Sequence, residues 1–132
     1  MNFVAVKSMH FSVRMVRLYH FLTVNKKEYI LSKQALRSGT SIGANITEAE
    51  NAFSKREFLA KMYIAFKESC ETIYWLQLLH NTGYLTDNEF LSIYNDCVEL
   101  RQLLSSITKT TRENLGKRTK TYLEEMESIP HS

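Results

Sequence analysis

The sequence has few of the residues that break helices or cross-link chains. Of its 132 residues, one is proline, four are glycine and two are cysteine. So little proline and glycine, with 44% hydrophobic residues, favours a mostly helical protein. Two cysteines are too few for a secreted disulfide scaffold. No apolar run is long enough to span a bilayer, and no segment resembles a signal peptide, so we expect a cytoplasmic protein with no membrane partner.

Small residues concentrate between Leu31 and Asn51, in a stretch that keeps helical spacing. Gly39 and Gly43 each cost a helix about 1 kcal/mol relative to alanine, and close packing against another helix would offset that cost. The alternative, a phosphate-binding loop, is disfavoured because the chain contains neither G-x-x-x-x-G-K-[ST] nor G-x-G-x-x-G. Alternating steps of four and three predict one buried face here: Leu31, Ala35, Ser38, Ile42, Asn45 and Ala49.

Three junctions carry the same helix-start signal, an N-cap residue three positions before a glutamate. Each is flanked by an apolar pair that can close as a hydrophobic staple, such as Phe53 with Phe58. The three predicted capping boxes are Asn25 with Glu28, Ser54 with Glu57, and Thr86 with Glu89. Three such signals, each opening a periodic run, predict the starts of the second, third and fourth helices.

The apolar spacing predicts a first helix over residues 2–23, a third over 54–81 and a fourth over 86–111, with the second beginning at the Asn25 junction. Helices two to four would each be roughly 35–45 Å long. The predicted buried face of the third helix is Phe58, Met62, Ala65, Ser69, Thr72, Leu76 and Leu79. A second apolar stripe runs beside it: Leu59, Tyr63, Phe66, Cys70 and Ile73.

Four helices with short connections predict an all-α fold, an antiparallel up-down-up-down four-helix bundle formed by residues 1–115. Residues 116–132 are polar, and we expect either a frayed helical extension or a disordered tail there. A helix-turn-helix fold is disfavoured because the helices are long and no short recognition helix follows a tight turn.

Side chains capable of catalysis are present but not grouped. The histidines are scattered at positions 10, 20, 80 and 131, and no Glu-x-x-His motif of a di-iron bundle occurs. Cys70 and Cys97 are predicted to be buried. Glu68 and Glu71 are more simply explained as solvated or salt-bridged than as a catalytic pair. We therefore predict a non-enzymatic protein with no catalytic residue, no cofactor and no metal.

Charge is sorted along the chain. Residues 68–100 carry six acids and no base, whereas residues 101–120 carry six bases and one acid. An up-down bundle would place the second loop and the end of the fourth helix at one pole, and an ordinary solvated surface is the alternative to a functional site there. The predicted nucleic-acid-binding residues at this pole are Lys55, Arg56, Lys61, Lys109, Arg112, Lys117, Arg118 and Lys120.

The third helix carries more apolar surface than one face of a small bundle can hide. Its second stripe is joined by Tyr74 and Trp75. Surplus apolar surface of this extent usually marks an interface, so we expect more than one copy in the assembly.

Three blocks of sequence carry a family resemblance: LSKQALRSGTSIGANITEAE, KMYIAFKESCETIYWLQLL and DCVELRQLLSSITKT. The chain resembles the four-helix bundle proteins of the 23S rRNA-intervening-sequence family from about Phe11 to Thr110. The resemblance implies a homopentamer, and members of this family are encoded in insertions within large-subunit rRNA genes. A similar protein is the accessory factor of diversity-generating retroelements, which binds a reverse transcriptase and nucleic acid. No catalytic residue comes with the family.

These observations predict an oligomeric helical scaffold that associates with RNA, DNA or a nucleic-acid enzyme such as a reverse transcriptase. The alternative is an assembly module whose partner is another protein and which does not bind nucleic acid. A small-molecule enzyme is a distant third.

Overall fold

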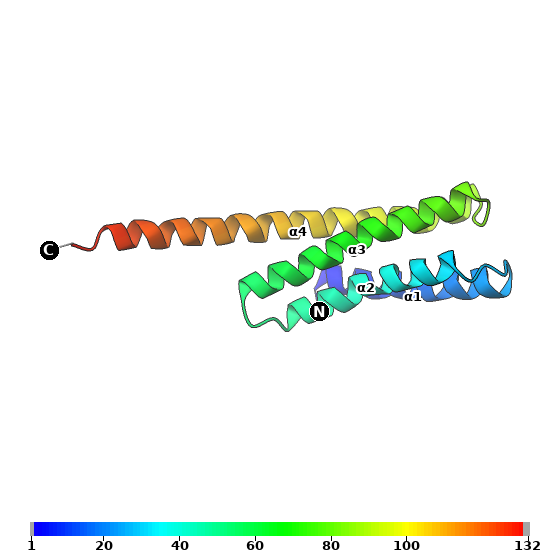
Figure 1. Ribbon diagram of the computed structural model, residues 1–132, viewed down its shortest axis with the longest axis horizontal. Helices are drawn as coiled ribbons and strands as arrows, with labels where there is room; N and C mark the ends of the chain where they lie inside the picture. Colours follow the sequence, from blue (N-terminus) through cyan, green and yellow to red (C-terminus); the bar gives the residue numbers. More distant parts are fainter. Residues whose placement is uncertain (1, 131–132) are drawn as a thin grey trace.

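Four helices make up the described part of the chain, residues 2–130 of a computed structural model. They are α1 (Phe3–Val24), α2 (Leu31–Glu50), α3 (Lys55–Asn81) and α4 (Asp87–Glu127). Helices that follow one another in sequence pack together, and α1 also packs against α4, which closes the bundle (Figure 1). The predicted all-α, antiparallel up-down-up-down bundle is confirmed. His131 lies outside the described residues.

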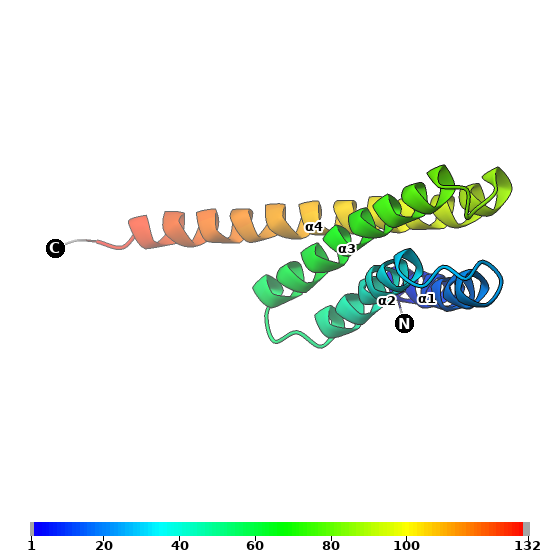
Figure 2. The ribbon, with the colours of Figure 1, turned by 45° about the vertical axis from the view of Figure 1, so that its right-hand side comes forward.

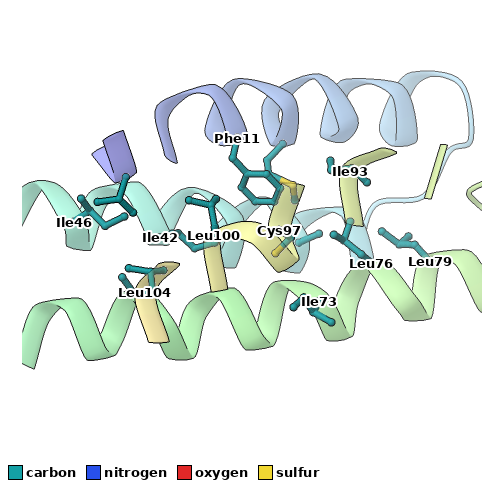
Figure 3. Close-up of a cluster of buried hydrophobic side chains, with 14 of the residues drawn as sticks. Phe11, Ile42, Ile46, Ile73, Leu76, Leu79, Ile93, Cys97, Leu100 and Leu104 are labelled. Atoms are coloured by element: carbon teal, nitrogen blue, oxygen red, sulfur yellow. The ribbon is translucent and has the colours of Figure 1, made fainter. Parts of the chain in front are cut away.

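The core runs along the axis of the bundle, with side chains from all four helices. Phe11, Ile42, Leu76 and Leu100 are each no more than 2% exposed, and Figure 3 shows the central part of this cluster. The predicted buried face of α3 is confirmed except at Phe58, which is half-buried.

The buried face of α2 departs from its prediction at Leu31, which is half-buried, and again near the C-terminal end. Ile46 is buried, whereas Asn45 is half-buried and donates its amide to the carbonyl oxygen of Ser41. Inside the bundle the Thr72 hydroxyl of α3 donates to Ser38 Oγ of α2 at 2.9 Å. A small polar pair therefore replaces an apolar contact where α2 and α3 meet.

The glycines of α2 face α1 at close range, as predicted. A Cβ added to Gly39 would lie 2.6 Å from Cγ of Met15, and one added to Gly43 would lie 3.3 Å from the hydroxyls of Ser8 and Ser12. Because only a hydrogen projects from each glycine, α1 and α2 can approach closely along this face.

The three predicted capping boxes have different outcomes. The box at Thr86 is complete, since its hydroxyl accepts from the Glu89 amide and the Glu89 carboxylate accepts from the Thr86 amide. At Ser54 the hydroxyl accepts from the Glu57 amide, but the Glu57 carboxylate accepts from the amide of Phe53. The predicted staple there is wrong, because the Phe53 side chain is fully exposed.

The predicted box at Asn25 is wrong. Asn25 caps the end of α1, and the chain turns through Lys27 with a φ of 55° before α2 begins at Leu31. The carboxylate of Glu28, which is only 7% exposed, then accepts from the amides of Ile30, Leu31 and Ser32 at 3.1, 2.8 and 2.7 Å. Glu28 thus satisfies the first amides of α2 in place of a short capping side chain.

The helices differ more in length than predicted. The 27 residues of α3 span about 40 Å, as expected, but the 20 residues of α2 span about 30 Å and the 41 residues of α4 about 60 Å. Residues 116–127 continue α4 as a helix beyond the end of the bundle, and Figures 1 and 2 show this extension in orange and red. No helix in residues 2–130 combines the length and apolarity needed to cross a bilayer.

Candidate nucleic-acid interface

Five of the predicted basic residues converge where α4 passes the start of α3. Lys55 and Arg56 lie in the first turn of α3, and the other three lie on α4. All five line three adjoining hollows that share Leu115. We call this surface the basic groove and define it by Lys55, Arg56, Arg112, Lys117 and Arg118.

The largest hollow of the basic groove has a volume of about 740 Å³ and is open to solvent. Two aromatic side chains line it, the fully exposed Phe53 of the α2–α3 turn and Tyr122 of α4, which is 58% exposed. Lys55, Arg56 and Arg118 line the same hollow. Positive side chains and exposed aromatic rings therefore share one concave surface.

The remaining predicted basic residues are not part of this groove. Lys61 forms an ion pair with Glu48 at 3.0 Å. Lys109 and Lys120 are exposed on α4 and line none of the described hollows. A helix distributes its side chains around its axis, so nearness in sequence did not place them on the same face.

Two residues of the groove were not predicted as part of a site. Phe53 was assigned only to a staple, and Tyr122 was placed in a polar tail. The sequence feature that could have identified them is an aromatic residue close to basic ones, as in FSKR at 53–56 and KRTKTY at 117–122. That pattern gains meaning only because the bundle brings the two segments together.

A second charged cluster joins α2 to α3. Arg37 pairs with Glu71 and lies 3.6 Å from Glu68, so the predicted salt-bridged role of the two acids is confirmed. Trp75 donates its indole N–H to Glu71 at 3.3 Å. Oε2 of Glu68 accepts no hydrogen bond from the described residues. Burial and the neighbouring Glu71 raise the pKa of Glu68, and Arg37 only partly opposes them.

The two cysteines differ in burial. Cys97 is buried as predicted, but the prediction for Cys70 is wrong, because its side chain is exposed. Among the described residues, no group of three or more histidine, cysteine, aspartate or glutamate side chains is placed to hold a metal ion. His80 instead approaches Asp87 at 2.7 Å, where α3 turns into α4.

The comparison with protein families matches the model described as 23S rRNA-intervening sequence protein over residues 2–106. The chain belongs to this family. No curated protein matches it. It is also similar to a crystal structure from Bacteroides thetaiotaomicron, described as a protein with unknown function from the S23 ribosomal protein family. The two chains are 54% identical with a TM-score of 0.80, over 81% of this chain and 99% of the other.

The match with the 23S rRNA-intervening sequence family ends inside α4. The family model stops at residue 106, whereas α4 continues to Glu127. Of the basic groove, only Lys55 and Arg56 fall within the matched region, and the family indicates no enzyme class. The α4 side of the groove is therefore a feature of this chain beyond what the family model describes.

Proposed function

We propose that this member of the 23S rRNA-intervening sequence family is a non-enzymatic, self-associating helical scaffold that binds RNA or DNA in its basic groove. One observation carries the proposal. Five cationic side chains from two separate helices line three adjoining hollows that meet at Leu115, and within residues 2–130 none of them forms an ion pair. By contrast, Lys7, Arg14 and Lys61 are each neutralised by an acid of a neighbouring helix.

The chemistry of the groove suits a nucleic-acid strand. Arginine and lysine neutralise phosphates, and Lys55 and Arg56 lie at the N-terminus of α3, where the helix dipole adds to their positive charge. Phe53 and Tyr122 expose rings on which bases can stack without sequence preference. We therefore expect sequence-tolerant binding that weakens steeply as salt concentration rises.

Self-association is supported by apolar side chains that the bundle leaves exposed. On α1, Met9, Val13 and Val16 are 65, 42 and 54% exposed and follow one another at helical spacing. On α3, Tyr63 and Tyr74 are 48 and 55% exposed. A cyclic assembly would repeat the basic groove in each copy and so multiply weak phosphate contacts. Light scattering tests the five copies that the family resemblance implies, and a monomer at micromolar concentration would contradict self-association.

Fluorescence anisotropy with short labelled RNA and DNA tests the groove directly. The double variant Arg112→Gln, Lys117→Gln removes two groove cations, and Lys109→Gln, Lys120→Gln removes two cations of α4 that lie outside it. Both variants lose the same net charge. We expect the groove variant to bind more weakly and to flatten the slope of log affinity against log salt by about one per lysine or arginine removed. The control variant should bind almost as well as the wild type.

Two results would reject the groove as a nucleic-acid site. One is the absence of binding in low salt at roughly tens of micromolar protein, a concentration at which most non-specific protein–nucleic-acid complexes form. The other is an equal loss of affinity in both double variants, which would show that binding depends on net charge and not on the groove. Absence of binding together with a defined oligomer would favour the alternative function, an assembly module whose partners are proteins. The partnership with a reverse transcriptase stays a prediction.

A further inference from the structure

The end of α4 has an apolar face with no helix beside it. Beyond the bundle, Tyr122, Leu123 and Met126 are between 45 and 58% exposed. They belong to the extension that projects past the α2–α3 turn in Figures 1 and 2. A single amphipathic helix in water gains no stability from its apolar side chains, so most helical stability must come from packing.

The spacing of these side chains is that of a coiled coil. Leu115, Thr119, Tyr122 and Met126 follow at steps of four and three, the seam spacing of a helix pair. The seam continues the face that α4 buries inside the bundle through Leu104 and Thr108. One face of α4 is therefore covered by the other helices inside the bundle and is uncovered beyond it.

Charge along the extension selects an antiparallel copy of itself as the partner. The bases Lys117, Arg118 and Lys120 precede the acids Glu124, Glu125 and Glu127. Within residues 2–130 none of these six side chains forms an ion pair. Two such segments side by side in opposite directions would place the basic half of each against the acidic half of the other.

The residues on the two flanks of the seam also favour an antiparallel orientation. Arg118 and Glu125 are seven apart on one flank, and Gly116 and Leu123 are seven apart on the other. In an antiparallel helix pair, like flanks face each other, so Arg118 meets Glu125 and Gly116 receives Leu123. The space around Gly116 is open, since a Cβ added there would meet nothing within 4 Å. A parallel pair would instead place Arg118 beside Leu123.

We propose that the end of α4, residues 115–127, pairs antiparallel with the same segment of a second copy of this chain. The acidic end of the second copy then lies along the hollow lined by Phe53, Lys55 and Arg56 and fills part of its volume of about 740 Å³. This interface goes beyond the proposed function and needs no nucleic acid, and because it uses Arg118 and the same hollow, the paired segment and a nucleic-acid strand would compete for the basic groove. It also differs from the exposed faces of α1 and α3, because it is formed by a segment outside the family match.

Charge reversal at two exposed positions tests the pairing without risk to the fold. Arg118→Glu and Glu125→Arg each turn two attractive contacts of the two-fold pair into two repulsive ones. Sedimentation velocity and light scattering of the full chain, in low salt and without nucleic acid, measure the association. We expect each single variant to raise the dissociation constant about tenfold or more, judged from the usual strength of surface ion pairs.

The double variant with both changes decides the orientation. It exchanges the two charges and restores their attraction, so its dissociation constant should return to that of the wild type. An equimolar mixture of the two single variants should associate as strongly, because each supplies the charges that the other lacks. Circular dichroism on each variant checks that the helices are intact.

Three results would overturn the proposal. Equal association of the wild type and both single variants would show that this segment does not pair. A double variant as weak as the single variants would exclude the antiparallel arrangement. A dissociation constant of the wild type that does not change with salt would exclude the charge contacts. Failure of the proposed function would be seen in different measurements. The molecular mass of the single variants reports self-association through the rest of the bundle, and the anisotropy assay reports nucleic-acid binding.

Discussion

Replacement of Gly39 by alanine tests whether close packing of α1 and α2 explains the glycines of α2. The added Cβ would lie 2.6 Å from Cγ and 2.9 Å from Cε of Met15. Carbon atoms prefer a separation of about 3.5–4.0 Å, so one side must move by roughly 1 Å. Met15 is 1% exposed, and the closest of its atoms is near the backbone, so the side chain has little room to move.

Two opposing terms set the size of the effect. Alanine favours a helix interior over glycine by about 1 kcal/mol. Overpacking of a closed core costs about 1–3 kcal/mol, and the contact with the near end of Met15 places Gly39 in the upper part of that range. We expect Gly39→Ala to lower the free energy of unfolding by about 1–2 kcal/mol.

Urea denaturation at one fixed protein concentration, followed by circular dichroism and by the single tryptophan, Trp75, measures this change. Gly116→Ala is the matched control at a protein concentration too low for the α4 segments to pair, because its Cβ then meets open space, and it should not lower the free energy of unfolding. In a Met15→Ala background, Gly39→Ala should stabilise by about 1 kcal/mol, since the clash is gone and the helix preference remains. An equal loss in both backgrounds, or a gain in the wild type, would refute the packing explanation.

Three further predictions concern titratable side chains. Glu28→Ala removes the acceptor for the amides of Ile30, Leu31 and Ser32 at the start of α2 and should lower the free energy of unfolding at pH 7 by about 1–3 kcal/mol, measured with urea. Burial alone would raise the pKa of Glu28, but its hydrogen bonds from Leu31, Ser32 and Ile30 outweigh burial and lower it, so the wild type should lose this stability as pH falls below 4.5. The pKa of Glu68 is raised, so the wild type loses stability as pH rises above 4.5, and Glu68→Gln should unfold at higher urea than the wild type at pH 7 but not below pH 4.5. Burial raises the pKa of Cys97 to about 12, so a thiol reagent at roughly pH 8 should label it only after unfolding, as peptide mass spectrometry would show.

Each of these predictions has a contrary outcome. A Glu28→Ala variant as stable as the wild type would mean that water satisfies the first amides of α2 equally well. A Glu68→Gln variant less stable than the wild type at pH 7 would show that the contact with Arg37 stabilises the fold by more than burial of the Glu68 carboxylate destabilises it. Labelling of Cys97 in the folded protein would show that the core opens locally.

The class of fold and the helix order were readable from spacing and composition alone. Steps of four and three mark the face of α3 that becomes buried, because a helix repeats every 3.6 residues whatever its neighbours are. The box at Thr86 was readable for the same reason, since cap and glutamate are three residues apart in one turn. Local geometry therefore accounts for these elements without any tertiary contact.

Two local signals had the right spacing but are not realised in the structure. Asn25 and Glu28 had the right spacing for a capping box, but burial of the α1–α2 turn brought the Glu28 carboxylate itself onto the amides of α2. Phe53 had an apolar partner in Phe58 at the spacing of a staple, yet its side chain remains exposed in the groove. Spacing indicates which contacts are possible, and packing selects among them.

The candidate site depended on the tertiary structure more than the fold did. The sequence located a basic pole, because up-down connectivity brings the second loop and the end of the last helix to one side. Which cations share a surface was decided by the rotation of α4 about its axis and by its length, which carries Lys117 and Arg118 past the first turn of α3. Lys61 is not part of the site, because it forms an ion pair with Glu48 of the preceding helix. Sequence order sets which segments meet, but only the packed helices determine which side chains face one another there.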